Sequence, residues 1–175
     1  MYNSILISIK KHWCDLIYAG IKTIEIRKNQ PFKNISVKMP FRAYIYETSS
    51  SGGAGMVTGY FECKTVIATN YYEGLVKGSC LTLQQMINYA DNKVLCGLLI
   101  GKVVKFKKPM PVSYFGFKRP PQSWQYIYHN VSNDLLYAAI KQYKLKNIDG
   151  MTCLDIIDKI QYKIKSQGGN KQCNT

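Results

Sequence analysis

The sequence has few acidic residues, few histidines and no long apolar run. Its 175 residues include 10 Asp and Glu against 24 Lys and Arg, and only 2 histidines. No stretch of about eighteen apolar residues occurs, so we expect no membrane-spanning helix and no membrane partner. The apolar run near the N-terminus is too short for a signal peptide and has no small-residue cleavage site, so we expect a cytoplasmic, intracellular protein.

Cysteine pairs with metal-binding spacing are also lacking. No two of the 6 cysteines have C-x-x-C spacing; they are Cys14, Cys63, Cys80, Cys96, Cys153 and Cys173. With only His12 and His129 to complete a tetrahedral set, the pattern matches no zinc template. No cluster of carboxylates suggests a two-metal nuclease. We therefore predict neither a metal nor a cofactor, and thiols that stay reduced in a cytosolic chain.

Positive charge is what the chain has in excess. The formal net charge is +14 at pH 7, and 13% of the residues are aromatic. This balance is typical of proteins with an anionic partner, most often nucleic acid. Compositional drift is an alternative explanation, because an AT-rich genome favours Lys, Asn, Ile and Tyr. We predict an RNA, nucleotide or nucleoside partner and leave the oligomeric state open.

The stretch at residues 20–28 reads as a short strand with charges on one face. Glu25 and Arg27 alternate with Ile24 and Ile26, and a period of two places the two sets on opposite sides of a sheet. We expect the isoleucines to enter a core. Glu25 and Arg27 would lie ~6.6 Å apart along the chain, facing either a ligand cleft or bulk water.

Strands and helices alternate in the first part of the chain. Strands are predicted at residues 4–9, 42–48, 56–69 and 98–107, with Gly59 and Gly101 as candidate bends. Residues 10–19 have the pattern of a helix with Trp13 on its apolar face, where we expect it to be a core residue, and Gly20 would end this helix. Short bent strands favour a small closed or nearly closed barrel.

Three further segments are read from caps and composition. Thr82-x-x-Gln85 is a capping box that would open a short helix. The Ser/Gly-rich tract 49–55 is either a flexible hairpin loop or a backbone nest for phosphate. Two helices are predicted at the C-terminal side, from about residue 132 to 144 and from Thr152 onward.

These segments and their order resemble the ASCH domain family of the PUA-like superfamily. The family signature G-x-K-x-x-E-x-R is present as Gly20, Lys22, Glu25 and Arg27, after the strand and helix that normally precede it. Phage-borne members often carry P-Q-S-W, found here at residues 121–124, which suggests a phage-encoded protein.

The resemblance implies an α+β fold, a PUA-like small β-barrel of about five to six strands with flanking helices. We predict that this domain covers residues 1–130, that residues 131–166 form a helical C-terminal extension packed on it, and that residues 167–175 are a tail. ASCH domains are generally proposed to bind RNA or nucleotides, at a charged cleft beside the signature strand.

Candidate ligand-binding residues follow from the signature, the aromatic residues and the basic cluster. Lysines would bind phosphate, Glu25 and Arg27 would read a base edge, and an aromatic ring would stack on the base. The predicted set is Lys22, Glu25, Arg27, Tyr46, Ser123, Trp124, Lys105 and Lys107.

Two alternatives to simple binding remain open. A hydrolase acting on a modified nucleoside or on RNA would use Lys22 and Glu25 as its catalytic pair. The deacetylating branch of the family, however, has a threonine where Glu25 stands and a glutamate near the position of Ser79, so its reaction is not carried over. The other alternative is a protein–protein adaptor that uses the basic surface.

Overall fold

The computed structural model describes residues 4–31, 39–127 and 153–167. The strands are β1 (Ser4–Lys10), β2 (Ile24–Arg27), β3 (Phe41–Thr48), β4 (Met56–Thr69), β5 (Leu95–Met110) and β6 (Trp124–Tyr126). The helices are α1 (Lys11–Tyr18), α2 (Glu73–Ser79), α3 (Leu83–Ala90) and α5 (Cys153–Gln167), with 3-10 turns η1 (Ser49–Ser51) and η2 (Val112–Phe115).

The six strands form one curled sheet in the order β2-β5-β4-β3-β1-β6. The β1–β3 pair is parallel, and the other four pairs are antiparallel. The sheet forms half a barrel, which confirms the predicted α+β class with a small barrel-like sheet. The register of β4 against β5 shifts between Val57 and Gly59 and again opposite Gly101, so both glycines lie at irregularities of the strands, where bends were predicted.

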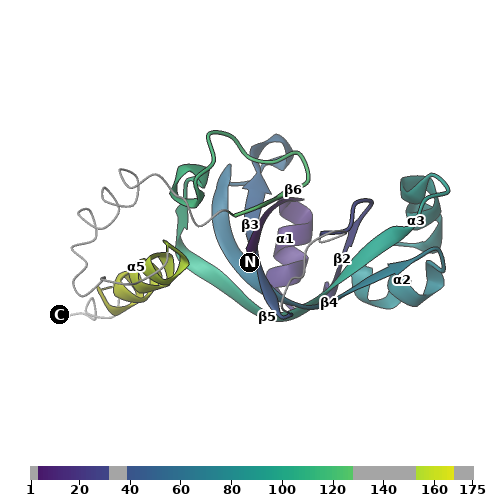
Figure 1. Ribbon diagram of the computed structural model, residues 1–175, viewed down its shortest axis with the longest axis horizontal. Helices are drawn as coiled ribbons and strands as arrows, with labels where there is room; N and C mark the ends of the chain where they lie inside the picture. The colour runs from purple at the N-terminus through teal and green to yellow at the C-terminus, as the bar shows by residue number, and fades with distance from the viewer. Residues whose placement is uncertain (1–3, 32–38, 128–152, 168–175) are drawn as a thin grey trace, which may run out of the picture.

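Helices lie on the sheet and at both ends of the molecule. In Figure 1, α1 lies beside the sheet between β3 and β2, α2 and α3 lie at one end, and α5 lies at the other. Alternate residues of β1 enter two separate cores: Ile5 and Ile7 pack with Ile17 of α1, whereas Leu6 packs with residues that include Ile157 of α5. Neither α1 nor any other described helix is long and apolar enough to cross a membrane.

The two edges of the curled sheet are joined by side chains. Arg27, at the end of β2, donates from Nη2 to the carbonyl oxygen of Ser8 in β1 at 2.8 Å. Trp124, at the start of β6, donates from Nε1 to the carbonyl oxygen of Asn29, just beyond β2, at 3.1 Å. We call this junction the seam. It brings the signature strand next to β1 and β6, which are its distant neighbours in the sheet order.

Two differences from the sequence predictions concern the helices. The insertion between β4 and β5 contains two helices, because residues 73–79 form α2 in addition to the predicted helix α3. The capping box is confirmed, since Thr82 and Gln85 each accept a hydrogen bond from the other's backbone N–H. The predicted helix at 132–144 lies outside the described residues, and the proposed division into residues 1–130, 131–166 and 167–175 stays a prediction.

Candidate functional site

The turn after α1 places Lys22 at the C-terminal end of that helix. Gly20 adopts a φ of +73°, the left-handed conformation that glycine reaches without strain. The N–H groups of Ile21 and Lys22 then both donate to the carbonyl oxygen of Leu16, which closes the end of the helix. The chain therefore reverses, and β2 begins at Ile24.

Lys22, Glu25 and Arg27 form a buried ion cluster. Glu25 lies between the two cations, with Oε1 2.8 Å from Arg27 Nη2 and Oε2 3.5 Å from Lys22 Nζ. All three residues are at least nine-tenths buried, so the charged face predicted for this strand does not meet bulk water. Ile24 and Ile26 enter a small core with Leu75, as expected from the alternation.

The ammonium group of Lys22 is fully engaged. It donates to the carbonyl oxygen of Ser79 at 2.6 Å, pairs with Glu25, and lies 5.0 Å from the ring centroid of Trp13. Burial lowers the pKa of Lys22, and the nearby Glu25 carboxylate opposes this shift. The arrangement therefore holds a buried ammonium ion in place with a carboxylate, a carbonyl oxygen and an aromatic face.

Arg27 connects the cluster to the seam. Besides Glu25 and the carbonyl oxygen of Ser8, it donates from Nη1 to Ser123 Oγ at 3.3 Å. Its Nε is buried and has no hydrogen-bond partner among the residues that the structure describes. Ser123, a predicted ligand-binding residue, is therefore brought to Arg27 and helps to fix its position.

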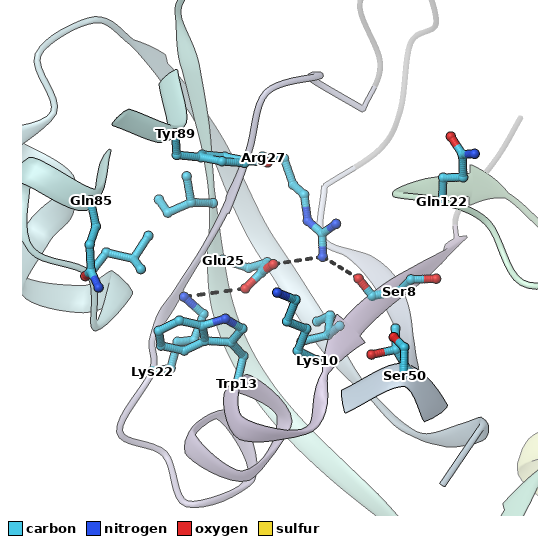
Figure 2. Close-up of a pocket in the computed structure, with 14 residues that line it drawn as sticks. Ser8, Lys10, Trp13, Lys22, Glu25, Arg27, Ser50, Gln85, Tyr89 and Gln122 are labelled. Atoms are coloured by element: carbon cyan, nitrogen blue, oxygen red, sulfur yellow. Dashed lines mark hydrogen bonds and ion pairs between the residues drawn. The ribbon is translucent and has the colours of Figure 1, made fainter. Parts of the chain in front are cut away.

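A cavity of about 400 Å³ lies beside the ion cluster. Figure 2 shows its lining side chains converging from β1, α1, β2, α3 and the segments that contain Ser50 and Gln122. Three cations (Lys10, Lys22 and Arg27) line it against one carboxylate. Its lining also contains two aromatic rings and two amides: Trp13, Tyr89, Gln85 and Gln122. The cavity is therefore positively charged and partly aromatic.

Trp13 packs against the core that contains Ile5, Ile7 and Ile17, as the sequence predicts, but its ring is not fully buried there. It is half-buried and lines the cavity, whereas the buried residues of α1 are Cys14 and Ile17. One residue step turns an α-helix by about 100°, so Trp13 points well away from the direction of Cys14. Together with Lys10, Gln85, Tyr89 and Gln122, it forms the cavity rim that sequence reasoning missed. The sequence holds one signal for this position of Trp13: neighbouring residues of a helix point in different directions, so Trp13 and Cys14 cannot both point fully into the core.

The remaining predicted residues do not line this cavity. Tyr46 is buried in the core that includes Leu6. Trp124 packs edge-on against Tyr126, with ring centroids 5.2 Å apart. Lys105 and Lys107 are exposed on β5, and Lys105 Nζ lies 5.1 Å from the ring centroid of Tyr18.

The loop at residues 49–55 does not form the phosphate nest considered from its sequence. The N–H groups of Gly52, Gly53 and Gly55 donate to backbone carbonyl oxygens within the turn, and that of Ala54 donates to Glu47 Oε1 at 3.1 Å. A nest needs free N–H groups, and these four are engaged. The loop instead supports α1, because the N–H of Lys11 donates to Ser51 Oγ.

No group of three or more His, Cys, Asp and Glu within 4–31, 39–127 and 153–167 is arranged to hold a metal ion. Burial raises the pKa of Cys63 to about 12, which keeps that thiol protonated at neutral pH. The lining of the cavity itself offers cations, amides, hydroxyls, one carboxylate and aromatic rings.

Comparisons with known proteins agree with this fold. A model of the ASCH domain matches residues 7–146. Similar solved structures are ASCH from Zymomonas mobilis and two of its point mutants, with TM-scores of 0.62 and identities of 17–18%. The alignments cover 77–78% of this chain and 94–97% of theirs. At this identity the likeness shows the fold, which is PUA-like as the resemblance implied. No curated protein sequence matches the chain significantly.

Proposed function

Because the chain belongs to the ASCH domain family, we propose that it binds RNA or a nucleotide, with one base or nucleotide held in the cavity beside the ion cluster. Members of this family are generally regarded as RNA-binding. The ligand's negative charge would be attracted by Lys10 and by the cluster, and its base would contact the aromatic rim.

The observation that carries this proposal is the composition of the cavity. Its volume of about 400 Å³ lies within the roughly 300–1,000 Å³ of small-molecule sites. Trp13 and Tyr89 present ring surface from two different helices, a suitable arrangement for holding a planar base. Gln85 Oε1 already accepts from the N–H of Thr82, so its amide N–H groups remain as donors for a base carbonyl or a phosphate.

The ion cluster itself supports binding more than hydrolysis. A general base must reach the proton that it removes, but both oxygens of Glu25 are engaged by cations. Lys22 likewise directs its ammonium group at Ser79 and Glu25. We therefore propose that the cluster shapes and charges the cavity while rim residues contact the ligand. The hydrolase and adaptor roles, the cytoplasmic location and the phage origin stay predictions.

Replacing Trp13 with Ala tests the site directly. We expect affinity for a mixed-sequence pool of eight-nucleotide single-stranded RNA to fall by roughly 10- to 100-fold, because loss of a stacking ring costs about 1–3 kcal/mol per base. Isothermal titration calorimetry would measure this, with a thermal melt confirming that the variant is folded. Tyr71→Ala is the matched control, since Tyr71 is 66% exposed and does not line the cavity. Equal losses in both variants would refute this site.

Salt dependence tests the role of the basic surface. We expect affinity for the same RNA pool to fall steeply between about 50 and 200 mM salt, because each phosphate contact releases counterions. Replacing Lys105 or Lys107 with Ala should weaken binding to all sequences equally and reduce the slope by about 0.7 per lost phosphate contact. An affinity that is flat across this salt range would rule out an electrostatic RNA interface.

A further inference from the structure

A second cavity of about 290 Å³ is lined by Lys28, Asn29, Gln30, Val94 and Cys96, and Lys28 contacts Tyr89 of the first cavity. We infer that the second cavity receives the adjacent nucleotide of a single-stranded RNA, so that the ligand is an oligonucleotide spanning both cavities. This inference rests on the proposed function of the first cavity and specifies the class of its ligand.

The two cavities are joined by one contact. Lys28 lines the second cavity, and its Nζ lies 5.0 Å from the ring centroid of Tyr89, which lines the first. Figure 2 shows Tyr89 on the same side of the first cavity as Arg27, the residue that precedes Lys28. A strand that leaves the first cavity past Tyr89 therefore meets Lys28 and then the second cavity.

The chemistry of the second cavity fits a nucleotide. None of the five described residues that line it is acidic, so these residues do not repel a phosphate. Asn29 and Gln30 carry amide side chains that can both donate to and accept from a base edge. The backbone of Asn29 is held in place by Trp124, whose indole N–H donates to its carbonyl oxygen. Val94 adds apolar surface and is 49% exposed.

The position of Lys28 favours an oligonucleotide over a free nucleotide. Its side chain is exposed and lies between two hollows, which is where the phosphodiester linking two adjacent nucleotides would run. A mononucleotide in the first cavity would leave the second one unused. Grooves that combine a cation for the backbone with rings and amides for successive bases are typical of proteins that bind single strands.

Length dependence is the test. Isothermal titration would compare the four nucleoside monophosphates, a mixed dinucleotide pool and the eight-nucleotide pool. We expect the dinucleotide pool to bind roughly tenfold more tightly than the monophosphates. Lys28→Ala, and separately Val94→Trp to fill the second cavity, should each remove most of that gain while leaving monophosphate affinity within about twofold. Lys93→Ala is the matched control, because the side chain of Lys93 is 71% exposed and lines neither cavity.

The outcomes separate the two proposals. If monophosphates bind as tightly as dinucleotides, the proposed role of the second cavity is refuted, whereas the proposed role of the first cavity is not. A length gain that survives both Lys28→Ala and Val94→Trp would also overturn it, because the second nucleotide would then lie elsewhere. Failure of every nucleotide and RNA to bind would refute the proposed function, and the inference with it.

Discussion

Glu25→Gln is expected to lower the free energy of unfolding by about 3–5 kcal/mol, because it leaves two buried cations without a compensating charge. The substitution keeps the size of the side chain, so the loss comes from charge rather than from packing. Lys22 and Glu25 are 2% and 5% exposed, and neither can regain full hydration in the folded protein. Denaturant unfolding at neutral pH, followed by circular dichroism, would measure the change.

The control for this variant is an ion pair on the surface. On α1, Lys11 Nζ lies 2.8 Å from Asp15 Oδ2, and the two side chains are 45% and 52% exposed. Because exposed ion pairs contribute little, Asp15→Asn should leave the free energy of unfolding nearly unchanged. The double variant Lys22→Met with Glu25→Gln should be more stable than Glu25→Gln alone, because one uncompensated charge is removed. An unfolding midpoint for Glu25→Gln equal to that of the native chain would contradict a stabilising cluster.

Gly59→Ala is expected to cost about 3 kcal/mol, at the upper end of the usual range for overpacking. A Cβ at this position would lie 2.2 Å from the carbonyl oxygen of Val104 and 2.8 Å from the hydroxyl of Tyr18. The carbonyl belongs to the neighbouring strand, so β4 and β5 must separate to make room. Thermal and denaturant unfolding would measure the loss.

Gly74→Ala in α2 is the matched control for the same added methyl group. The nearest atoms to a Cβ there belong to the Tyr71 ring, at 3.5 Å and 3.6 Å. Because alanine favours a helix over glycine, this variant should be more stable by about 0.5–1 kcal/mol. If Gly59→Ala unfolded at the same denaturant concentration as the native chain, the prediction that the two strands leave no room for a Cβ at Gly59 would be refuted.

The parts of the fold that sequence reasoning predicted have local signals. Alternation of apolar and polar residues located β2 and β3, and the Thr82–Gln85 capping box located α3. Helix α2 has no such signal: its seven residues include Gly74 and Gly78, and its first residue follows Tyr72, which makes no capping hydrogen bond through its side chain. Its stability comes from tertiary packing, because Leu75 is buried in one core with Ile24.

The site was predictable only where one motif contained it. The spacing of Lys22, Glu25 and Arg27 identified them as site residues. The spacing could not show that the three side chains form ion pairs with one another. The residues of the cavity rim come from β1, α1, α3 and the segment before β6, and these meet only in the folded chain. Trp124 looked like a stacking platform in the sequence, yet its indole N–H is used to hold Asn29 at the seam.

The arrangement of a buried cluster behind a rim has a consequence for how such a protein can evolve. Exchanging Gln122, which is exposed, leaves no ion unpaired, so a single substitution there can alter the ligand while the fold stays intact. In this chain a substitution at Glu25 costs stability, whatever it does to recognition. Ligand preference can therefore diverge between descendants of this chain while its ion cluster stays the same.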